Sequence, residues 1–358
     1  MTRLARSLAA IAAANLLWGV GWSFAPLIPL YALEVGVSEA LYGLVYGLGL
    51  LVAMVSGLLG GLLASRGPRA AWATAVASYA VAGLGLLVMF AWRGLPGFVL
   101  GYALYSLNSV GWPPLAALLS GARASSRVMV FALSTSVRVG AALGGAVAYR
   151  VAGTAAEGLW AASLVFLVSA IPALLLDTRG FQPRRHGRLV LRAYREALLY
   201  GAASALPLVF APFAPYYLRA AGLEVREVPL YYVSLHAAGM VLPPLLAPYP
   251  VLVAVLLAAA PLLVYSGVHA AMLLGLAFLS LAGALDEILY AHVSRARPGD
   301  PLLAGALQTA RNLARAPASW LGGALYSVGP ALHVSVSALA TALMAALLRP
   351  KGPQLRGS

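Results

Sequence analysis

Long apolar stretches follow one another along the whole chain, and each is long enough to cross a lipid bilayer. A helix needs roughly 17 to 25 residues to span a hydrocarbon core about 30 Å thick. The 358 residues are 62% hydrophobic and only 9% charged, with a mean hydropathy of +0.88. A water-soluble fold of this size needs more polar surface than this composition supplies. The sequence therefore predicts an all-α polytopic membrane protein.

Twelve transmembrane helices are predicted from apolar length and from glycine and proline punctuation. The first six lie at 7–32, 40–64, 70–92, 96–119, 128–149 and 158–176, and the second six at 197–219, 229–247, 250–266, 268–293, 302–328 and 331–349. We interpret 1–176 as an N-terminal six-helix bundle, 177–196 as a basic cytoplasmic linker, 197–349 as a C-terminal six-helix bundle and 350–358 as a cytoplasmic tail.

The formal net charge of +14 is explained by topology rather than by nucleic acid, because the arginines lie in short connections between apolar spans. With the N-terminus inside, seventeen cations fall in cytoplasmic segments and four outside. The positive-inside rule then predicts a multi-pass protein of the plasma membrane with both termini cytoplasmic. The linker is interpreted as a basic loop, with a helix lying on anionic membrane lipids as the alternative. No cysteine is present, so disulfides are excluded.

The two halves of the chain repeat a spaced F-A-P-x-x-P-x-Y pattern. Phe24, Pro26 and Tyr31 of the first predicted span reappear as Phe210, Pro212 and Tyr217 of the seventh, each 186 positions later. Two similar bundles that rock about a shared central site are the simplest construction for a machine that opens alternately to two sides of a membrane. The repeat therefore predicts two pseudo-symmetric bundles and a transporter.

The connection after the second span carries a more local pattern. It resembles the loop motif G-x-x-x-D-R-x-G-R-R/K of the major facilitator superfamily, a family of twelve-helix secondary transporters, and Gly61, Arg66 and Arg69 match that motif. Ser65 stands where the family has aspartate, and Pro68 where it has glycine. The resemblance implies the twelve-helix fold, alternating access, and a gating loop formed by Gly61, Ser65, Arg66 and Arg69.

Two stripes of amide and aromatic side chains lie near mid-depth of the first and fourth spans. Their members recur at i, i+3 and i+7, and they are Asn15, Trp18 and Trp22 in one span and Tyr105, Asn108 and Trp112 in the other. Tryptophans that anchor a helix at the membrane surface would lie at the span ends. The stripes are therefore predicted to line a substrate cavity for an amphipathic or ring-bearing ligand, with helix packing as the alternative.

Besides the terminal residues Arg219 and Arg349, five charged residues fall inside predicted spans, where a charge costs roughly 2.5 to 3.5 kcal/mol and needs a partner. Asp286 and Glu287 lie in the tenth span, Arg311 and Arg315 in the eleventh, and Arg138 in the fifth. Glu287 and Arg311 lie at similar distances from the cytoplasmic ends of their spans, which favours an ion pair between them. Asp286 and Glu287 point about 100° apart, so one of them is a proton-carrier candidate, with a static ion-pair network as the equal alternative. Arg138 is predicted to hold an anionic substrate. The alternative is that its guanidinium bonds backbone carbonyls or a carboxylate of the protein itself.

The leading hypothesis is a secondary active transporter for a small solute, with protons as candidate coupling ions. Efflux of amphipathic compounds within the same fold is the alternative, and a membrane enzyme or scaffold without transport is the other class. Four of the five histidines fall in predicted spans, His236, His269, His292 and His333, and they share no i, i+4 pair, so no metal site is predicted. No nucleophile and base arrangement and no phosphate-binding loop is found, so neither enzyme activity nor a cofactor is expected.

Overall fold

The computed structural model describes residues 3–179, 181–183, 191–246, 248–283, 295 and 297–347, and within these ranges the chain is helical with no strand. The N-terminal half contains α1 Arg3–Trp22, α2 Leu27–Glu34, α3 Glu39–Ala64, α4 Pro68–Ala91, α5 Leu95–Ser106, α6 Trp112–Gly121, α7 Ser126–Val130, α8 Ser136–Val151 and α9 Ala155–Ala173. The C-terminal half contains α10 Leu191–Ala205, α11 Ala214–Ala220, α12 Glu227–Leu246, α13 Pro250–Tyr265, α14 His269–Leu279, α16 Pro301–Val328 and α17 Pro330–Leu347.

The predicted spans coincide with helical segments wherever the structure describes them, and the range 268–293 continues into residues outside that description. Among the described residues, five helical segments are long and apolar enough to cross a membrane, or six if α1 and α2, which are bent by 41°, form one span. The all-helical membrane class is thus confirmed. The number twelve and the pseudo-symmetry of the halves stay predictions.

Several predicted spans are not continuous α-helices, which corrects the sequence analysis. The fourth span is α5, a 3-10 segment Leu107–Gly111, and α6. Pro113 and Pro114 open α6 and have no N–H to donate to the preceding turn, so the α-helical hydrogen bonds stop there. The fifth span similarly passes through a π-helical turn, Phe131–Thr135, between α7 and α8.

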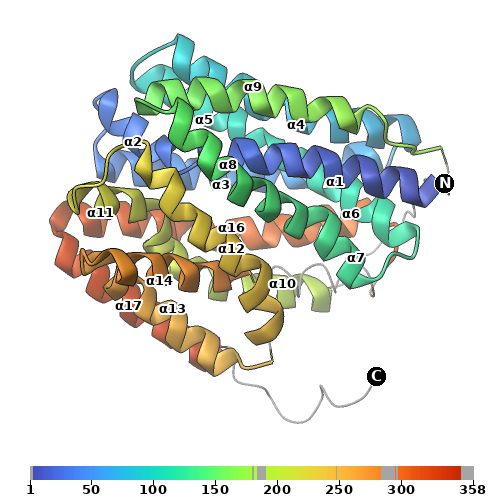
Figure 1. Cartoon of the computed structure of the whole chain (residues 1–358). Helices are drawn as coiled ribbons and strands as arrows, with labels where there is room; N and C mark the ends of the chain where they lie inside the picture. The colour runs from blue at the N-terminus through green and yellow to red at the C-terminus, as the bar shows by residue number, and fades with distance from the viewer. Residues whose placement is uncertain are drawn as a thin grey trace.

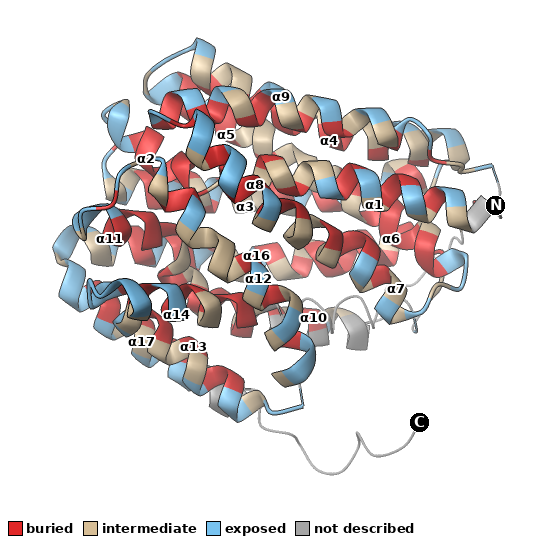
Figure 2. Ribbon diagram, viewed as in Figure 1, coloured by how far each residue is buried: buried red, intermediate tan, exposed pale blue. Residues whose placement is uncertain are grey.

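The outward faces of the helices are apolar rather than polar. On α3, Leu44, Leu48, Val55, Leu58 and Leu62 are all more than 40% exposed and follow a helical stripe. Figure 2 shows the buried residues facing the interior and the exposed ones around the outside of the bundle. An exposed apolar stripe on a long helix suits hydrocarbon as the surrounding solvent.

The longest contact between the two halves of the sequence is made by α3 and α16, which run antiparallel and which we call the α3–α16 seam. A Cβ on Gly43 would lie 2.7 Å from the carbonyl oxygen of Ser319, and one on Gly61 would lie 2.5 Å from that of Pro301. The two helices therefore approach backbone to backbone near both ends of α3, where glycine permits it. Between these points, Gly47 and Gly57 face the side chains of Trp320 and Gln308.

A second antiparallel contact joins α8 of the first half to α12 of the second, and we call it the α8–α12 seam. A Cβ on Gly145 would lie 3.8 Å from the Cβ of Val233. Farther along, the guanidinium of Arg138 occupies the place where Gly239 would carry its Cβ. In Figure 1, α4, α5 and α9 lie on one side of the molecule and α13, α14 and α17 on the other, with the seam helices between them.

Candidate substrate-binding site

Asn15 lies on α1 and is hydrogen-bonded at both ends of its amide. Its Nδ2 donates to the carbonyl oxygen of Ala132 at 2.7 Å, and its Oδ1 accepts from the Tyr79 hydroxyl at 2.7 Å. Ala132 belongs to the π-helical turn, where the hydrogen-bond pattern of the helix changes. The buried amide thus ties α1 to α4 and to the fifth span, an arrangement that favours the packing alternative for this residue.

The two tryptophans of the first stripe face different neighbours. Trp18 packs within the N-terminal half, with its ring centroid 4.4 Å from Phe166 and 5.8 Å from Tyr79. Trp22, one turn farther along α1, reaches across to the C-terminal half, where its ring lies 5.0 Å from that of His236. Of the predicted stripe, Trp22 is therefore the member that contacts both halves.

The second predicted stripe is interrupted by the 3-10 segment of the fourth span. Three residues per turn replace 3.6, so Tyr105, Asn108 and Trp112 are not arranged as on one straight α-helix. The Asn108 Nδ2 donates to the carbonyl oxygen of Tyr105 at 2.6 Å, closing the turn locally. Tyr105 packs 5.9 Å from Phe166, and Trp112 begins α6 and packs half-buried against a core cluster.

Arg138 lies on the α8–α12 seam, half-buried, with its guanidinium against Gly239. A Cβ at Gly239 would also come within 3.3 Å of the Ser280 Cβ, so the third chain segment around this position is the one that follows α14. The structure thus brings Arg138 to the contact between the two halves. Whether its charge holds a substrate stays a prediction.

The two arginines of the eleventh span lie on the side of α16 that faces α10. Arg315 donates from Nε to the Ser204 hydroxyl at 2.7 Å. The backbone of Arg311 packs against Gly201, where an added Cβ would lie 2.9 Å from the Arg311 Cα. Asp286 and Glu287 lie outside the described residues, so the predicted pair between Glu287 and Arg311 stays a prediction.

The predicted gating loop is a tight connection between α3 and α4. Ser65 ends α3, and its hydroxyl donates to the carbonyl oxygen of Leu62 at 2.7 Å. Arg66 and Arg69 are exposed, and Gly61 packs against the start of α16. Pro68 is the first residue of α4, a position that proline favours, which explains why proline is compatible with the place of the family's glycine.

Aromatic rings join the two halves at the Tyr42 end of the molecule. The Tyr42 ring of α3 lies 5.7 Å from Phe213 and 5.9 Å from Tyr216, in edge-on orientation to both. The Tyr216 hydroxyl also donates to the carbonyl oxygen of Pro29 at 3.2 Å. These contacts close the interior from this end, because buried aromatic pairs pack without room for solvent.

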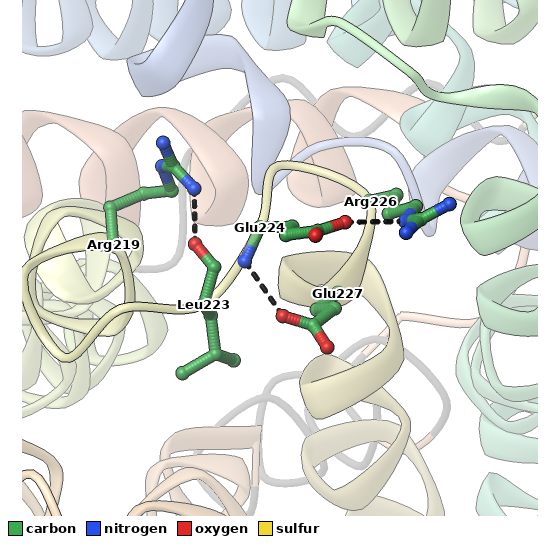
Figure 3. Close-up of polar contacts among 5 residues, drawn as sticks. All are labelled: Arg219, Leu223, Glu224, Arg226 and Glu227. Carbon is green, nitrogen blue, oxygen red and sulfur yellow. Dashed lines mark hydrogen bonds and ion pairs between the residues drawn. The ribbon is translucent and has the colours of Figure 1, made fainter.

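The loop between α11 and α12 adds a second connection at the same end, shown in Figure 3. The Arg219 guanidinium donates to the carbonyl oxygen of Leu223, and the Glu224 N–H donates to a carboxylate oxygen of Glu227 at 2.7 Å. Arg226 pairs with Glu224 at 2.6 Å and lies over the Tyr149 ring of α8, 5.5 Å from its centroid. The loop thus touches the last turn of α8 where the α8–α12 seam begins.

The opposite end is also closed by a contact between the halves. The Gly299 N–H, just before α16, donates to the Ser120 hydroxyl of α6 at 3.0 Å. A Cβ on Gly121 would come within 3.1 Å of the Gly299 Cα, so the backbones approach closely there. The two halves are therefore also in contact at this end.

His236 is the residue that the sequence analysis did not connect with binding. It lies on α12 one turn from Gly239, is 3% exposed, and neither ring nitrogen has a hydrogen-bond partner among the described residues. The sequence analysis considered histidines only as metal ligands. A histidine in the middle of an apolar span was nevertheless a signal, because intramembrane ionisable groups are costly and most often functional.

Comparison with solved structures aligns the chain with transporters over essentially its whole length. The xylose transporter XylE from E. coli, in a partially occluded inward open conformation, matches with a TM-score of 0.70 and 15% identity, covering 100% of both chains. The human organic anion transporter MFSD10 (TETRAN) matches with a TM-score of 0.70 and 14% identity, covering 98% of this chain and 100% of that one. A D-xylose-proton symporter matches at 0.64 and 15% identity, covering 96% and 97%.

No family model matches the sequence, and no curated protein matches it. At identities of 14 to 15%, the structural matches establish the fold. The chain therefore has the fold of these solved transporters, and within the described residues it carries helical segments apolar enough to cross a membrane. The resemblance seen in the loop motif is thereby confirmed at the level of the fold.

Proposed function

We propose that this protein is a secondary active transporter that moves a small solute across the membrane by alternating access. The moving bodies are the bundles 1–176 and 197–349, joined by the basic linker 177–196. The observation that carries the proposal is the α8–α12 seam, where the charged Arg138 of one half lies against Gly239 of the other within apolar helical segments. A charge in such a place is costly unless it has a function.

The two seams, together with the contacts between the halves at both ends of the bundle, support a rocking mechanism. Antiparallel helices with small residues at their contact can separate at one end while staying packed at the other. The aromatic contacts at Tyr42 and the Ser120–Gly299 hydrogen bond would then open in turn. Both termini in the cytoplasm of a plasma membrane protein complete the proposed topology, from the distribution of positive charge.

The solute is proposed to be a small organic anion, and protons are the proposed coupling ions. MFSD10 is described as an organic anion transporter, and another neighbour as a D-xylose-proton symporter. In this chain Arg138 is the proposed anion contact. Asp286 or Glu287 is the proposed proton carrier, with Arg311 and Arg315 as the partner cations of the same region.

A second candidate function, efflux of amphipathic compounds, is favoured by a continuous series of aromatic rings in the N-terminal half. Neighbouring centroids lie 4.4 to 5.9 Å apart along the series. Its members are Tyr79, Trp18, Phe166, Tyr105, Tyr102 and Tyr46. Aromatic surface of this kind suits apolar or ring-bearing ligands. Export of a fluorescent amphipathic dye from proteoliposomes, compared with uptake of organic acids, separates the two candidates.

The first experiment is a flux measurement on purified protein in proteoliposomes, with a panel of organic acids, sugars and amphipathic dyes, with and without a proton gradient. We expect uptake of an organic acid that rises with the gradient. The variant Arg138→Gln should lower the apparent affinity for that acid at least about tenfold, since a hydrogen bond to a charged group is worth about 1.5 to 3 kcal/mol. Arg150→Gln, on the exposed end of the same helix, is the matched control.

Flux of every solute at the level of empty liposomes would refute the transporter proposal. Unchanged acid affinity in Arg138→Gln would refute the anion contact alone, and it would leave efflux in place.

The second experiment tests alternating access by cross-linking each seam. The chain has no cysteine of its own, so introduced pairs are the only thiols. Gly145→Cys with Val233→Cys joins positions whose Cβ atoms are 3.8 Å apart, within the range that a disulfide requires. Gly57→Cys with Gln308→Cys joins the α3–α16 seam, where the corresponding distance is 3.3 Å. Each oxidised pair should stop transport, and a reductant should restore it.

Each single-cysteine variant, treated with the same oxidant, is the control for the cross-linking experiment. Full transport with either disulfide intact would show that the cross-linked seam does not open, and alternating access about both seams would be wrong.

A further inference from the structure

Two buried histidines in the second half of the chain are held in opposite ways. His333, on α17, is hydrogen-bonded at both nitrogens: Nδ1 to the Tyr217 hydroxyl at 2.7 Å and Nε2 to the carbonyl oxygen of Val209 at 2.7 Å. His236, on α12, is also buried at 3% exposure, yet neither of its nitrogens has a partner in the described part of the chain. Hydrogen bonds within the protein account for the burial of His333, whereas none among the described residues accounts for that of His236.

His236 costs the fold stability where it stands, because an imidazole that leaves water without a hydrogen-bond partner loses its solvation. Its ring contacts Trp22 of α1, 5.0 Å away and inclined by 53°. The ring therefore lies between the two halves of the sequence. A residue that serves only to fill this space would be apolar, so the imidazole is placed to hydrogen-bond a bound solute.

The residues around His236 indicate which chemical groups a bound solute would carry. Gly239 lies three residues along the same helix, and its missing side chain leaves the space that the Arg138 guanidinium occupies. Three residues of helix rise by about 4.5 Å. The Arg138 guanidinium and the His236 imidazole are thus set about one helical turn apart along α12, with the indole of Trp22 beside the imidazole.

We infer that His236 is a substrate-binding residue, which hydrogen-bonds a second polar group of a small organic acid whose carboxylate lies at Arg138. This inference rests on the proposed transport function and names its substrate class: acids with a hydroxyl or other hydrogen-bonding group about one helical turn from the carboxylate. The imidazole carries one donor and one acceptor, so it accommodates either sense of hydrogen bond. Sugars, which lack the carboxylate, and simple alkyl acids, which lack the second group, fit the site less well.

The test uses two probes that differ by one hydroxyl, 4-hydroxybutyrate and butyrate. Their affinities are measured by equilibrium binding to the purified full chain in detergent, and their uptake is measured in proteoliposomes. The wild-type protein should bind 4-hydroxybutyrate about tenfold more tightly than butyrate, the discrimination expected of one buried hydrogen bond. His236→Leu should abolish that preference and leave butyrate binding unchanged, and His236→Gln should restore part of it.

The same variants give a thermal readout that separates binding from folding. His236→Leu should raise the apparent melting temperature, because it removes an unpartnered buried polar group, whereas His333→Leu should lower it by leaving Tyr217 and Val209 without their partner. Gly239→Ala should weaken both acids equally, since its methyl group displaces the Arg138 guanidinium. Gly329→Ala, where an added Cβ meets nothing within 4 Å, is the matched control and should change neither.

A wild-type protein that does not distinguish the two acids, or a His236→Leu variant that keeps the preference, would overturn the inference. Failure of both acids to bind would overturn the substrate class. In each case the transport proposal is judged separately by the full solute panel: flux of another solute keeps it, and no flux of any solute removes it.

Discussion

The two seams between the halves are built from the same kind of helix pair and differ in what fills them. Along the α3–α16 seam, glycines bring backbone against backbone, as at Gly43 and Gly323, where an added Cβ on either would lie 2.8 to 3.0 Å from the other's Cα. Along the α8–α12 seam, Gly145 meets a valine side chain and Gly239 meets an arginine side chain. The first seam is thus closed largely by main-chain atoms, with Gly47 facing the Trp320 side chain and Gly57 that of Gln308, whereas the second is closed largely by side chains.

This difference separates mechanical from chemical roles. A seam closed by the main chain leaves no room for a ligand, and its geometry tolerates little change. A seam closed by long side chains can exchange those contacts for a solute without moving either helix. The costly groups, Arg138 and the unpartnered His236, lie on the second seam or one turn from it. We therefore expect stability to depend on the first seam and specificity on the second.

The largest effect is expected from Gly43→Val on the α3–α16 seam. The branched side chain would collide with the backbone of Ser319 and Gly323, and neither can move without shifting α16. Overpacking of this kind costs about 1 to 3 kcal/mol or more. The apparent melting temperature in detergent should fall by about 5 °C or more, and transport should be lost. Leu48→Ala, on the exposed face of α3, is the control. An unchanged melting temperature would contradict the close approach of the two helices.

A smaller and sharper contrast comes from placing the same methyl group on each seam. Gly43→Ala meets backbone atoms at 2.7 and 2.8 Å and should lower the apparent melting temperature. Gly239→Ala meets the far end of the flexible Arg138 side chain, which can turn away, so the melting temperature should stay within about 2 °C of the wild type. If both variants lose stability equally, the distinction between the seams fails.

The sequence predicted the helical ranges well, because apolar length and glycine and proline punctuation act locally. It placed Trp22 and Arg138 in apolar segments, and the structure brings both against residues of the second half. Their place in a substrate cavity stays a prediction. It did not predict the interruptions at Leu107–Gly111 and Phe131–Thr135, since a helical period says which face is polar and not whether the hydrogen-bond pattern continues. The stripe of Tyr105, Asn108 and Trp112 assumed a straight α-helix, which Pro113 and Pro114 do not allow.

Partners across the bundle were beyond the sequence for a different reason. Asn15 looked like a cavity residue, and only the fold brings Tyr79 and Ala132 to both ends of its amide. The sequence analysis did not single out Gly239, because its importance depends on the Arg138 guanidinium that occupies the place of a side chain there. The value of His236 likewise appears only when its lack of partners is set beside the two hydrogen bonds of His333.

A modest loss is expected from Thr309→Val on the α3–α16 seam. The Thr309 hydroxyl donates to the carbonyl oxygen of Met54 at 3.0 Å, and valine keeps the shape without the donor. The lost hydrogen bond is worth about 1 kcal/mol, or about 2 to 4 °C in apparent melting temperature. The apparent affinity for the transported solute should not change, because the bond belongs to the mechanical seam. A changed affinity with unaltered stability would show that the α3–α16 seam takes part in binding, which would contradict the separation of roles.

The smallest effect is expected at the rim of the α8–α12 seam, from Arg226→Gln. This arginine contacts the Glu224 carboxylate and the Tyr149 ring, but the paired side chains are 49% and 61% exposed, so solvent screens the charge. Removing the pair should cost less than about 1 kcal/mol, and the thermal shift should vanish in high salt. Chemistry on this seam depends on buried groups, so solute affinity should stay as in the wild type. If Arg226→Gln weakens binding as strongly as Arg138→Gln does, the rim takes part in recognition, and the site extends along the whole seam rather than lying at its middle.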